Sequence, residues 1–196
     1  ADVASAEAKL AQGYLGGIGE RTRIQKRLTE LYDFETYGVP FREGARYFYE
    51  HNTGLQGQSV LFVTNGAGGK PAVALDPNTL SQAGSLAIAG YVAGPNGKLL
   101  AYGVSVGGSD WTDWRVRDLA TGKDLPDVIR WTKYYKPVFT HDGTGLFYSA
   151  FPAPPAGDEL KVRDLGNALY YHALGTPQSA DRKLFDRADP PDWQYE

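Results

Sequence analysis

The sequence predicts a mainly β protein made of about three four-stranded β-propeller blades behind a short N-terminal helical segment. Three observations predict this fold: a turn-and-strand motif that occurs three times, an aromatic fraction of 13%, and 24 glycines and 12 prolines among 196 residues. Tyrosine and phenylalanine favour half-buried strands, whereas glycine and proline favour turns. We place the helical segment at residues 1–36 and the partial propeller at residues 37–196.

Two helices are predicted before the strands begin, at residues 3–12 and 19–32. In the second helix, Ile24, Leu28 and Leu31 recur at helical spacing, and most of the basic residues fall on its other faces. Strand and turn patterns follow for the rest of the chain.

The repeated motif is a tight turn followed by a strand. It reads REGARYFY at residues 42–49, PNGKLLAY at 95–102 and HDGTGLFY at 141–148. The turn glycines, Gly44, Gly97 and Gly143, lie about 53 and 46 residues apart, an interval typical of propeller blades. Further strands follow each motif, as expected for a four-stranded blade, whereas a β-sandwich does not repeat a motif at this interval. Since three blades do not close a ring, we expect a piece of a longer propeller.

Composition and charge exclude several classes of function. The net charge of −3 argues against nucleic acid as a partner, because such binding depends on neutralising phosphates. The absence of cysteine excludes disulfides and thiolate chemistry. No apolar run approaches the roughly 18 residues needed to cross a bilayer, so no membrane partner is predicted and a cytoplasmic location is the default. Methionine is also absent, which favours a processed, redesigned or excised chain.

Residues 103–107 match the G-x-S-x-G pattern of a serine nucleophile, but their surroundings argue against that role. The pattern works on a strained turn from a strand into a helix, and no helix is indicated after Ser105. Ser105 is therefore interpreted as an ordinary strand or loop residue. His51, His141 and His172 are scattered and are interpreted as structural or surface residues. No metal and no cofactor are predicted.

Three further segments are interpreted as loops or surface. Residues 65–71 lack the spacing of a phosphate-binding loop and predict a hairpin loop instead. The mixed-charge segments 158–161 and 181–183 are interpreted as solvated. Several aromatic residues fit either the blade core, which is favoured, or an exposed peptide-binding surface: Trp111, Trp114, Trp131, Tyr134 and Tyr135.

Several blocks, in order along the chain, resemble the N-terminal region of prolyl oligopeptidases. They are residues 27–34 (RLTELYDF), 37–40 (YGVP), 47–49 (YFY), 52–56 (NTGLQ), 75–78 (LDPN), 108–111 (GSDW), 125–128 (LPDV), 140–143 (THDG) and 170–176 (YYHALGT). The resemblance implies a serine peptidase with an α/β-hydrolase domain that carries the triad and a seven-bladed propeller inserted after a short helical stretch. It implies short peptides cut after proline as substrates, and it places the hydrolase domain and the remaining blades outside this chain.

The resemblance also implies four substrate-binding residues. Tyr134 matches an aromatic position in the pocket for the third residue before the cut, and Gln194 matches a second position of that pocket. Asp110 and Trp111 match a pair at the interface with the hydrolase domain, where the aspartate can pair with a substrate-positioning arginine. No catalytic residue is assigned, and the chain alone is expected to be an inactive substrate gate. The alternative is a non-catalytic propeller module that binds peptides or proteins.

Overall fold

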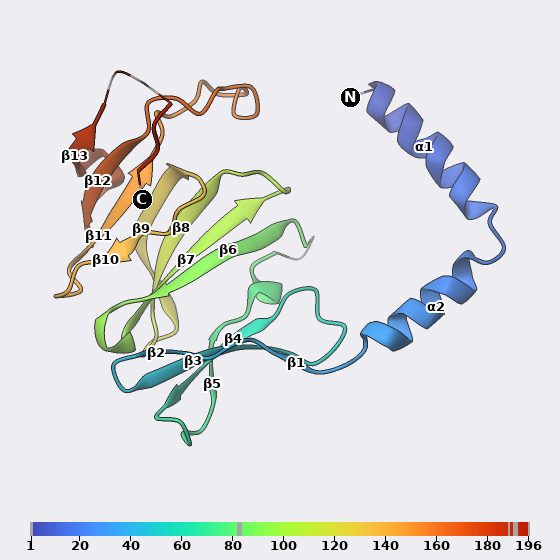
Figure 1. Ribbon diagram of the computed structural model, residues 1–196, viewed down its shortest axis with the longest axis horizontal. Helices are drawn as coiled ribbons and strands as arrows, with labels where there is room; N and C mark the ends of the chain where they lie inside the picture. Colours follow the sequence, from blue (N-terminus) through green and yellow to red (C-terminus); the bar gives the residue numbers. More distant parts are fainter. Residues whose placement is uncertain (1, 82–83, 188, 190–191, 196) are drawn as a thin grey trace.

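Figure 1 shows a computed structural model of the chain, which describes residues 2–81, 84–187, 189 and 192–195. Two helices, α1 (Asp2–Gly16) and α2 (Arg21–Tyr32), extend away from three β-sheets. Both predicted helices are present. The first continues beyond its predicted end at residue 12 and stops where two glycines, at positions 16 and 17, disfavour further helix.

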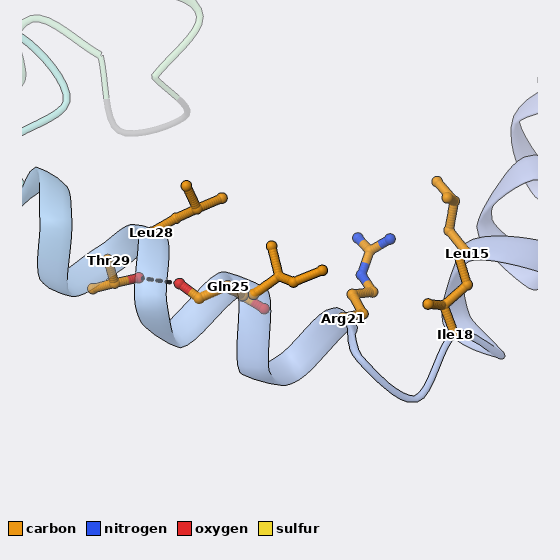
Figure 2. A pocket seen from close by; sticks show the side chains of 7 residues that line it. Leu15, Ile18, Arg21, Gln25, Leu28 and Thr29 are labelled. Carbon is orange, nitrogen blue, oxygen red and sulfur yellow. Dashed lines mark hydrogen bonds between the residues drawn. The ribbon is translucent and has the colours of Figure 1, made fainter.

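One side of the helix pair is apolar and open. Leu15, Ile18 and Leu28 line a hollow of about 400 Å³, and Figure 2 shows their side chains. Ile24 and Leu28, which belong to the predicted apolar face of α2, are 50% and 49% exposed. Within the described part of the chain, no residue of α2 is buried. The apolar face of α2 is therefore left without a covering partner by the described residues.

The first sheet has five strands arranged in four rows. The strands are β1 (Thr36–Tyr37), β2 (Phe41–Glu43), β3 (Arg46–Asn52), β4 (Val60–Asn65) and β5 (Ala72–Leu75). β1 and β2 both pair antiparallel with β3, one after the other along its length. Pro40 lies between them and has no N–H to donate to a ladder, which explains the interruption of this outer row. Residues 65–71 hold the predicted hairpin loop between β4 and β5.

The second and third sheets are four-stranded antiparallel meanders in chain order. The second contains β6 (Leu86–Ala93), β7 (Leu99–Val106), β8 (Thr112–Asp118) and β9 (Lys123–Thr132). The third contains β10 (Val138–Phe139), β11 (Gly145–Ala150), β12 (Ala168–Ala173) and β13 (Arg182–Asp186). Short 3₁₀ helices occupy connections, namely η1 (Pro77–Thr79), η2 (Pro95–Gly97) and η3 (Gln178–Ala180). One meander per sequence period confirms the predicted blades.

The three repeated turns occupy the same place in each sheet, between its first and second rows. Gly44, Gly97 and Gly143 have φ angles of 61°, 63° and 73°, in the left-handed region that favours glycine. A Cβ on Gly44 would lie 2.9 Å from the Cα of Asn96, in the corresponding turn of the second sheet. The first two turns therefore pack directly against each other.

The hydrophobic core lies between facing sheets. Phe48, Leu61 and Leu100 belong to the cluster between the first and second sheets. Trp114 and Leu146 belong to the cluster between the second and third sheets. Trp114 is thus a core residue, as the favoured interpretation of this tryptophan predicted.

The outward faces of the two end sheets are aromatic. On the first sheet the Tyr49 ring lies 6.1 Å from Tyr37 and 5.6 Å from Phe62, between ring centroids. On the third sheet Phe147 and Tyr171 are 5.5 Å apart. These residues alternate along their strands with core residues, so they point away from the second sheet. The first and third sheets therefore each present hydrophobic side chains on the face that no neighbouring sheet of the described chain covers.

A buried cluster of hydrogen-bonded polar side chains joins the second sheet to the third. The His172 ring, from β12, has Nε2 2.9 Å from Asp127 Oδ1, in β9, and Nδ1 2.7 Å from Asp181 Oδ1. Asp181 also accepts a bond from the Tyr148 hydroxyl, and burial together with this bond raises the pKa of Tyr148. The expectation that residues 181–183 are solvated is wrong for Asp181, whose side chain is 2% exposed because these partners enclose it. His172 is a structural residue, as expected.

Candidate functional site

The predicted site residues lie in loops at one end of the sheets. β7 runs away from its glycine turn and ends at Val106, so the segment 107–111 lies at the end opposite the repeated turns. The antiparallel path returns to this same end after β9, at residues 133–137. It does so again after β11, in the segment of residues 151–167 that we call the long loop. β1 begins at this end too, since Thr36 pairs with Asn52 at the end of β3. The helical segment and the site loops therefore share one end.

Lys133 is the buried cation of this end. It directly follows β9, is 8% exposed, and its Nζ lies 2.6 Å from Asp164 Oδ1 in the long loop. The same ammonium group lies 4.1 Å from the centre of a Trp111 ring, a cation–π contact. A buried charge is costly unless it is paired. Asp164 is therefore the partner that allows the Lys133 ammonium group to lie beside the Trp111 ring.

Tyr134 stands next to this cation with an unusual backbone conformation. Its φ is 64°, and that of Trp131, three residues earlier, is 63°. Each such non-glycine residue costs of order 1–3 kcal/mol and persists only where surrounding contacts hold it. The Tyr134 hydroxyl donates to Asp164 Oδ2 at 2.6 Å, although the residue as a whole is 58% exposed. This bond raises the pKa of Tyr134 to about 12, and the Lys133 and Tyr134 bonds together lower the pKa of Asp164.

Trp111 is packed rather than fully exposed. Its indole N–H donates to the Glu159 carbonyl oxygen, in the long loop, at 2.7 Å. The Trp111 ring meets Trp131 and Phe151 edge-on, at centroid distances of 5.6 and 6.0 Å. A hollow of about 290 Å³ adjoins this group, with Arg130 and the two tryptophans among its lining. The result is a surface that combines aromatic rings with fixed polar groups, which suits the binding of side chains more than bond-breaking chemistry.

Asp110 and Gln194, the other two predicted site residues, are both exposed and form no hydrogen bond with Trp111 or Tyr134 among the described residues. Asp110 is exposed, and its negative charge contributes to the raised pKa of Tyr134, after the larger effect of Asp164. Gln194 is also exposed, and no hydrogen bond among the described residues joins it to Asp110, Trp111 or Tyr134. Its neighbour Tyr195 is tied by its backbone N–H to Asn167 Oδ1, at the end of the long loop. Among the described residues, Lys133 and Asp164 thus link Trp111 to Tyr134, whereas no hydrogen bond links Gln194 to this group.

Two residues of this site, Lys133 and Asp164, were not predicted as site residues. Lys133 had a usable signal, because a lysine inside the run WTKYY is flanked by aromatic rings on both sides. Asp164 had none, since it reaches its partners from about 30 residues away through a loop without periodicity.

Ser105 has no nucleophile geometry. It lies in β7, inside an antiparallel sheet, and its hydroxyl donates to the Ser109 carbonyl oxygen. No serine hydroxyl of residues 2–81 and 84–187 hydrogen-bonds a histidine, so the described chain contains no assembled serine–histidine pair. The interpretation of the G-x-S-x-G match as a strand sequence is confirmed.

The fold and this loop surface define the chain as a section of a β-propeller with a candidate binding surface at one end. It matches the family model for the prolyl oligopeptidase N-terminal β-propeller domain over residues 4–196. The chain belongs to this family.

Similar proteins and structures agree with this assignment. A prolyl endopeptidase of Elizabethkingia meningoseptica is 36% identical over 178 residues, which is 91% of this chain and 25% of that protein. The prolyl oligopeptidase ophP of Omphalotus olearius is 31% identical over 217 residues, covering 95% of this chain and 28% of that one. The structure of prolyl oligopeptidase B from Galerina marginata, bound to a 25-residue macrocyclization substrate, has a TM-score of 0.85 at 25% identity and covers 97% and 29% of the two chains.

The chain spans about a quarter of the length of the curated relatives it matches. Among the helices of the described residues, none has the length and apolar character needed to span a membrane.

Proposed function

We propose that this chain is the N-terminal propeller portion of a prolyl oligopeptidase-type serine endopeptidase that cleaves short peptides after proline. In this proposal the chain gates substrate entry, forms part of the substrate pocket through Asp110, Trp111, Tyr134 and Gln194, and is inactive alone. The observation that carries the proposal is the cluster of Trp111, Lys133, Tyr134 and Asp164 at the sheet end from which the helical segment also departs.

Three exposed surfaces support the proposed partners. The apolar face of α2, with Ile24 and Leu28 about half exposed, suits packing against an α/β-hydrolase domain at the end of the site loops. The aromatic outward faces of the first and third sheets suit further blades. Tyr37, on the first sheet, is 62% exposed, and Phe147, on the third, is 39% exposed. A short proline-containing peptide would lie between the site loops and the hydrolase domain.

The proposal is tested with a chromogenic dipeptide substrate that ends in proline. We expect no turnover by residues 1–196 alone and turnover by the full-length protein that contains them. A Ser105→Ala substitution should leave that turnover unchanged, because the Ser105 hydroxyl is engaged by a backbone carbonyl. Turnover by the chain alone that Ser105→Ala abolishes would refute the proposal. A gene without hydrolase sequence around this segment would favour the non-catalytic binding module instead.

A further inference from the structure

We propose that Asp164 is a positioning residue, which fixes the Tyr134 ring and the Lys133–Trp111 pair and thereby sets how well the site accepts the third substrate residue before the cut. The inference rests on the proposed function for its substrate and on the geometry of the long loop for its mechanism.

The two oxygens of one carboxylate are divided between two neighbouring residues that directly follow β9. Oδ1 of Asp164 takes the Lys133 ammonium group at 2.6 Å, and Oδ2 takes the Tyr134 hydroxyl at 2.6 Å. Asp164 is 30 and 31 residues away from these partners in the sequence. A single side chain of the long loop therefore sets the orientation of both donors.

Tyr134 depends on this contact more than a typical exposed tyrosine does. Its ring projects from a backbone with positive φ and is largely exposed, so packing holds it weakly. Among the described residues, its hydroxyl forms no hydrogen bond other than that to Asp164. Without the carboxylate, the ring is free to adopt other rotamers, and the binding surface loses its fixed shape.

Lys133 extends the effect of Asp164 to Trp111. Its ammonium group is held between the carboxylate and the Trp111 ring, where most of the side chain is shielded from water. Removing the negative charge leaves a buried cation that gains by moving outward to solvent. The Trp111 ring then loses its cationic partner and keeps the bond from its N–H to the Glu159 carbonyl oxygen.

The long loop is joined to the second sheet by few bonds. Phe151, at its start, donates its N–H to the Trp131 carbonyl oxygen. Further along, the described contacts with that sheet are the Glu159 carbonyl and the Asp164 carboxylate. The backbone bonds at Lys161, Val162 and Leu165 are local to the loop itself. Loss of Asp164 therefore removes the side-chain hydrogen bonds that, among those described, join the last part of the long loop to residues 133 and 134.

The first experiment measures hydrogen exchange of the long loop in the full-length protein. Asp164→Asn should raise the exchange rate of amides in residues 158–167 about tenfold, because the attached form becomes less populated. Asp158→Asn is the matched control, since Asp158 lies in the same loop and its side chain pairs, among the described residues, with exposed Lys161 alone. We expect exchange near residues 164–167 to stay unchanged in that control. Equal exchange in Asp164→Asn and the unsubstituted protein would overturn the positioning role, whatever the enzyme's substrate.

The second experiment separates substrate binding from catalysis. With chromogenic substrates that extend to a large third residue before the cut, Asp164→Asn should raise KM about tenfold and leave kcat within about twofold. A dipeptide substrate that does not reach this position should show no change in KM. An equal KM rise for both substrates, or a fall in kcat with KM unchanged, would overturn the specificity role.

A double substitution tests whether Tyr134 carries the effect. Tyr134→Phe alone should raise KM less than Asp164→Asn, because the Lys133 ion pair persists. Added to Asp164→Ala, which leaves no side-chain acceptor at this position, it should change KM no further, since the bond it removes is already lost. Additive effects of the two substitutions would contradict the shared mechanism. Failure of every variant and of the unsubstituted protein to cut proline substrates would refute the proposed function, while hydrogen exchange would still decide the role of Asp164.

Discussion

Replacing His172 with leucine should strongly destabilise the contact between the second and third sheets. His172 is fully buried, and the side chains of its two partners, Asp127 and Asp181, are 1% and 2% exposed. Leucine is close in volume to histidine but donates no hydrogen bond. The substitution therefore leaves two carboxyl groups in the interior, each without the ring nitrogen that faced it.

The magnitude follows from what each carboxyl group retains. Asp181 keeps the Tyr148 hydroxyl and Asp127 keeps the Gly175 N–H, at 2.6 Å in both cases. Asp127 Oδ2 already has no partner among the described groups. Each buried carboxyl group left short of a hydrogen-bond partner costs about 1–3 kcal/mol, so the two together cost about 2–6 kcal/mol. We expect His172→Leu to lower the free energy of unfolding by this amount.

The assay is urea unfolding followed by tryptophan fluorescence. Trp114 belongs to the core cluster between the same two sheets and reports on their separation. With a slope of about 2 kcal/mol per molar urea, the midpoint should fall by about 2 M. His141→Leu is the control, because His141 is exposed in a turn and should leave the midpoint unchanged. A shift below about 0.5 M for His172→Leu would refute the reasoning that His172 holds the two carboxyl groups together.

Three further predictions concern the turns and the site. Gly44→Ala should lower the thermal midpoint more than Gly143→Ala. Both substitutions place an alanine at a positive φ, which costs about 1–2 kcal/mol. Only the alanine at position 44 also brings a Cβ to 2.9 Å from the Cα of Asn96. An absorbance titration should find the Tyr134 phenol ionising at a pKa of about 12, and Asp164→Asn should return it toward its ordinary 10.0. Lys133 first, and Tyr134 second, lower the pKa of Asp164 in the folded state. Its stabilising effect is therefore fully present above its ordinary pKa of 3.8 and is lost as the pH falls through the lower folded value. The stability difference between the protein and Asp164→Asn in urea unfolding should thus be constant near neutral pH and shrink only in acid.

The strands and turns were predictable because their causes are local. Asn-Gly and Asp-Gly steps favour the positive φ of a turn, and each of the three repeated turns is followed by a strand that contributes residues to the core. The split of the outer row into β1 and β2 has a local cause in Pro40 as well. Local causes of this kind are readable from a single sequence.

The charged contacts were not predictable because their causes are distant. Asp181 and Lys183 belong to the same mixed-charge run, yet Asp181 is buried and Lys183 is half exposed beside Asp186. The difference lies in His172 and Tyr148, which reach Asp181 from neighbouring strands of the third sheet. Composition within a short window contains no information about such partners.

The two ends of the sheets differ in how far their structure can be predicted from local sequence, and this difference explains where the candidate site lies. At one end, short turns with glycine at positive φ join neighbouring strands, and these turns are predicted by their own residues. At the other end, the segments 107–111, 133–137 and 151–167 are held by contacts such as Trp111 to Glu159 and Lys133 to Asp164, between residues 48 and 31 positions apart. Long-range contacts can hold Trp131 and Tyr134 in backbone conformations that local preference disfavours, and conformations of this kind concentrate at functional sites. The end at which the sequence is least predictive is therefore the end at which the strongest evidence for function should be sought, and the Asp164 variants test it there.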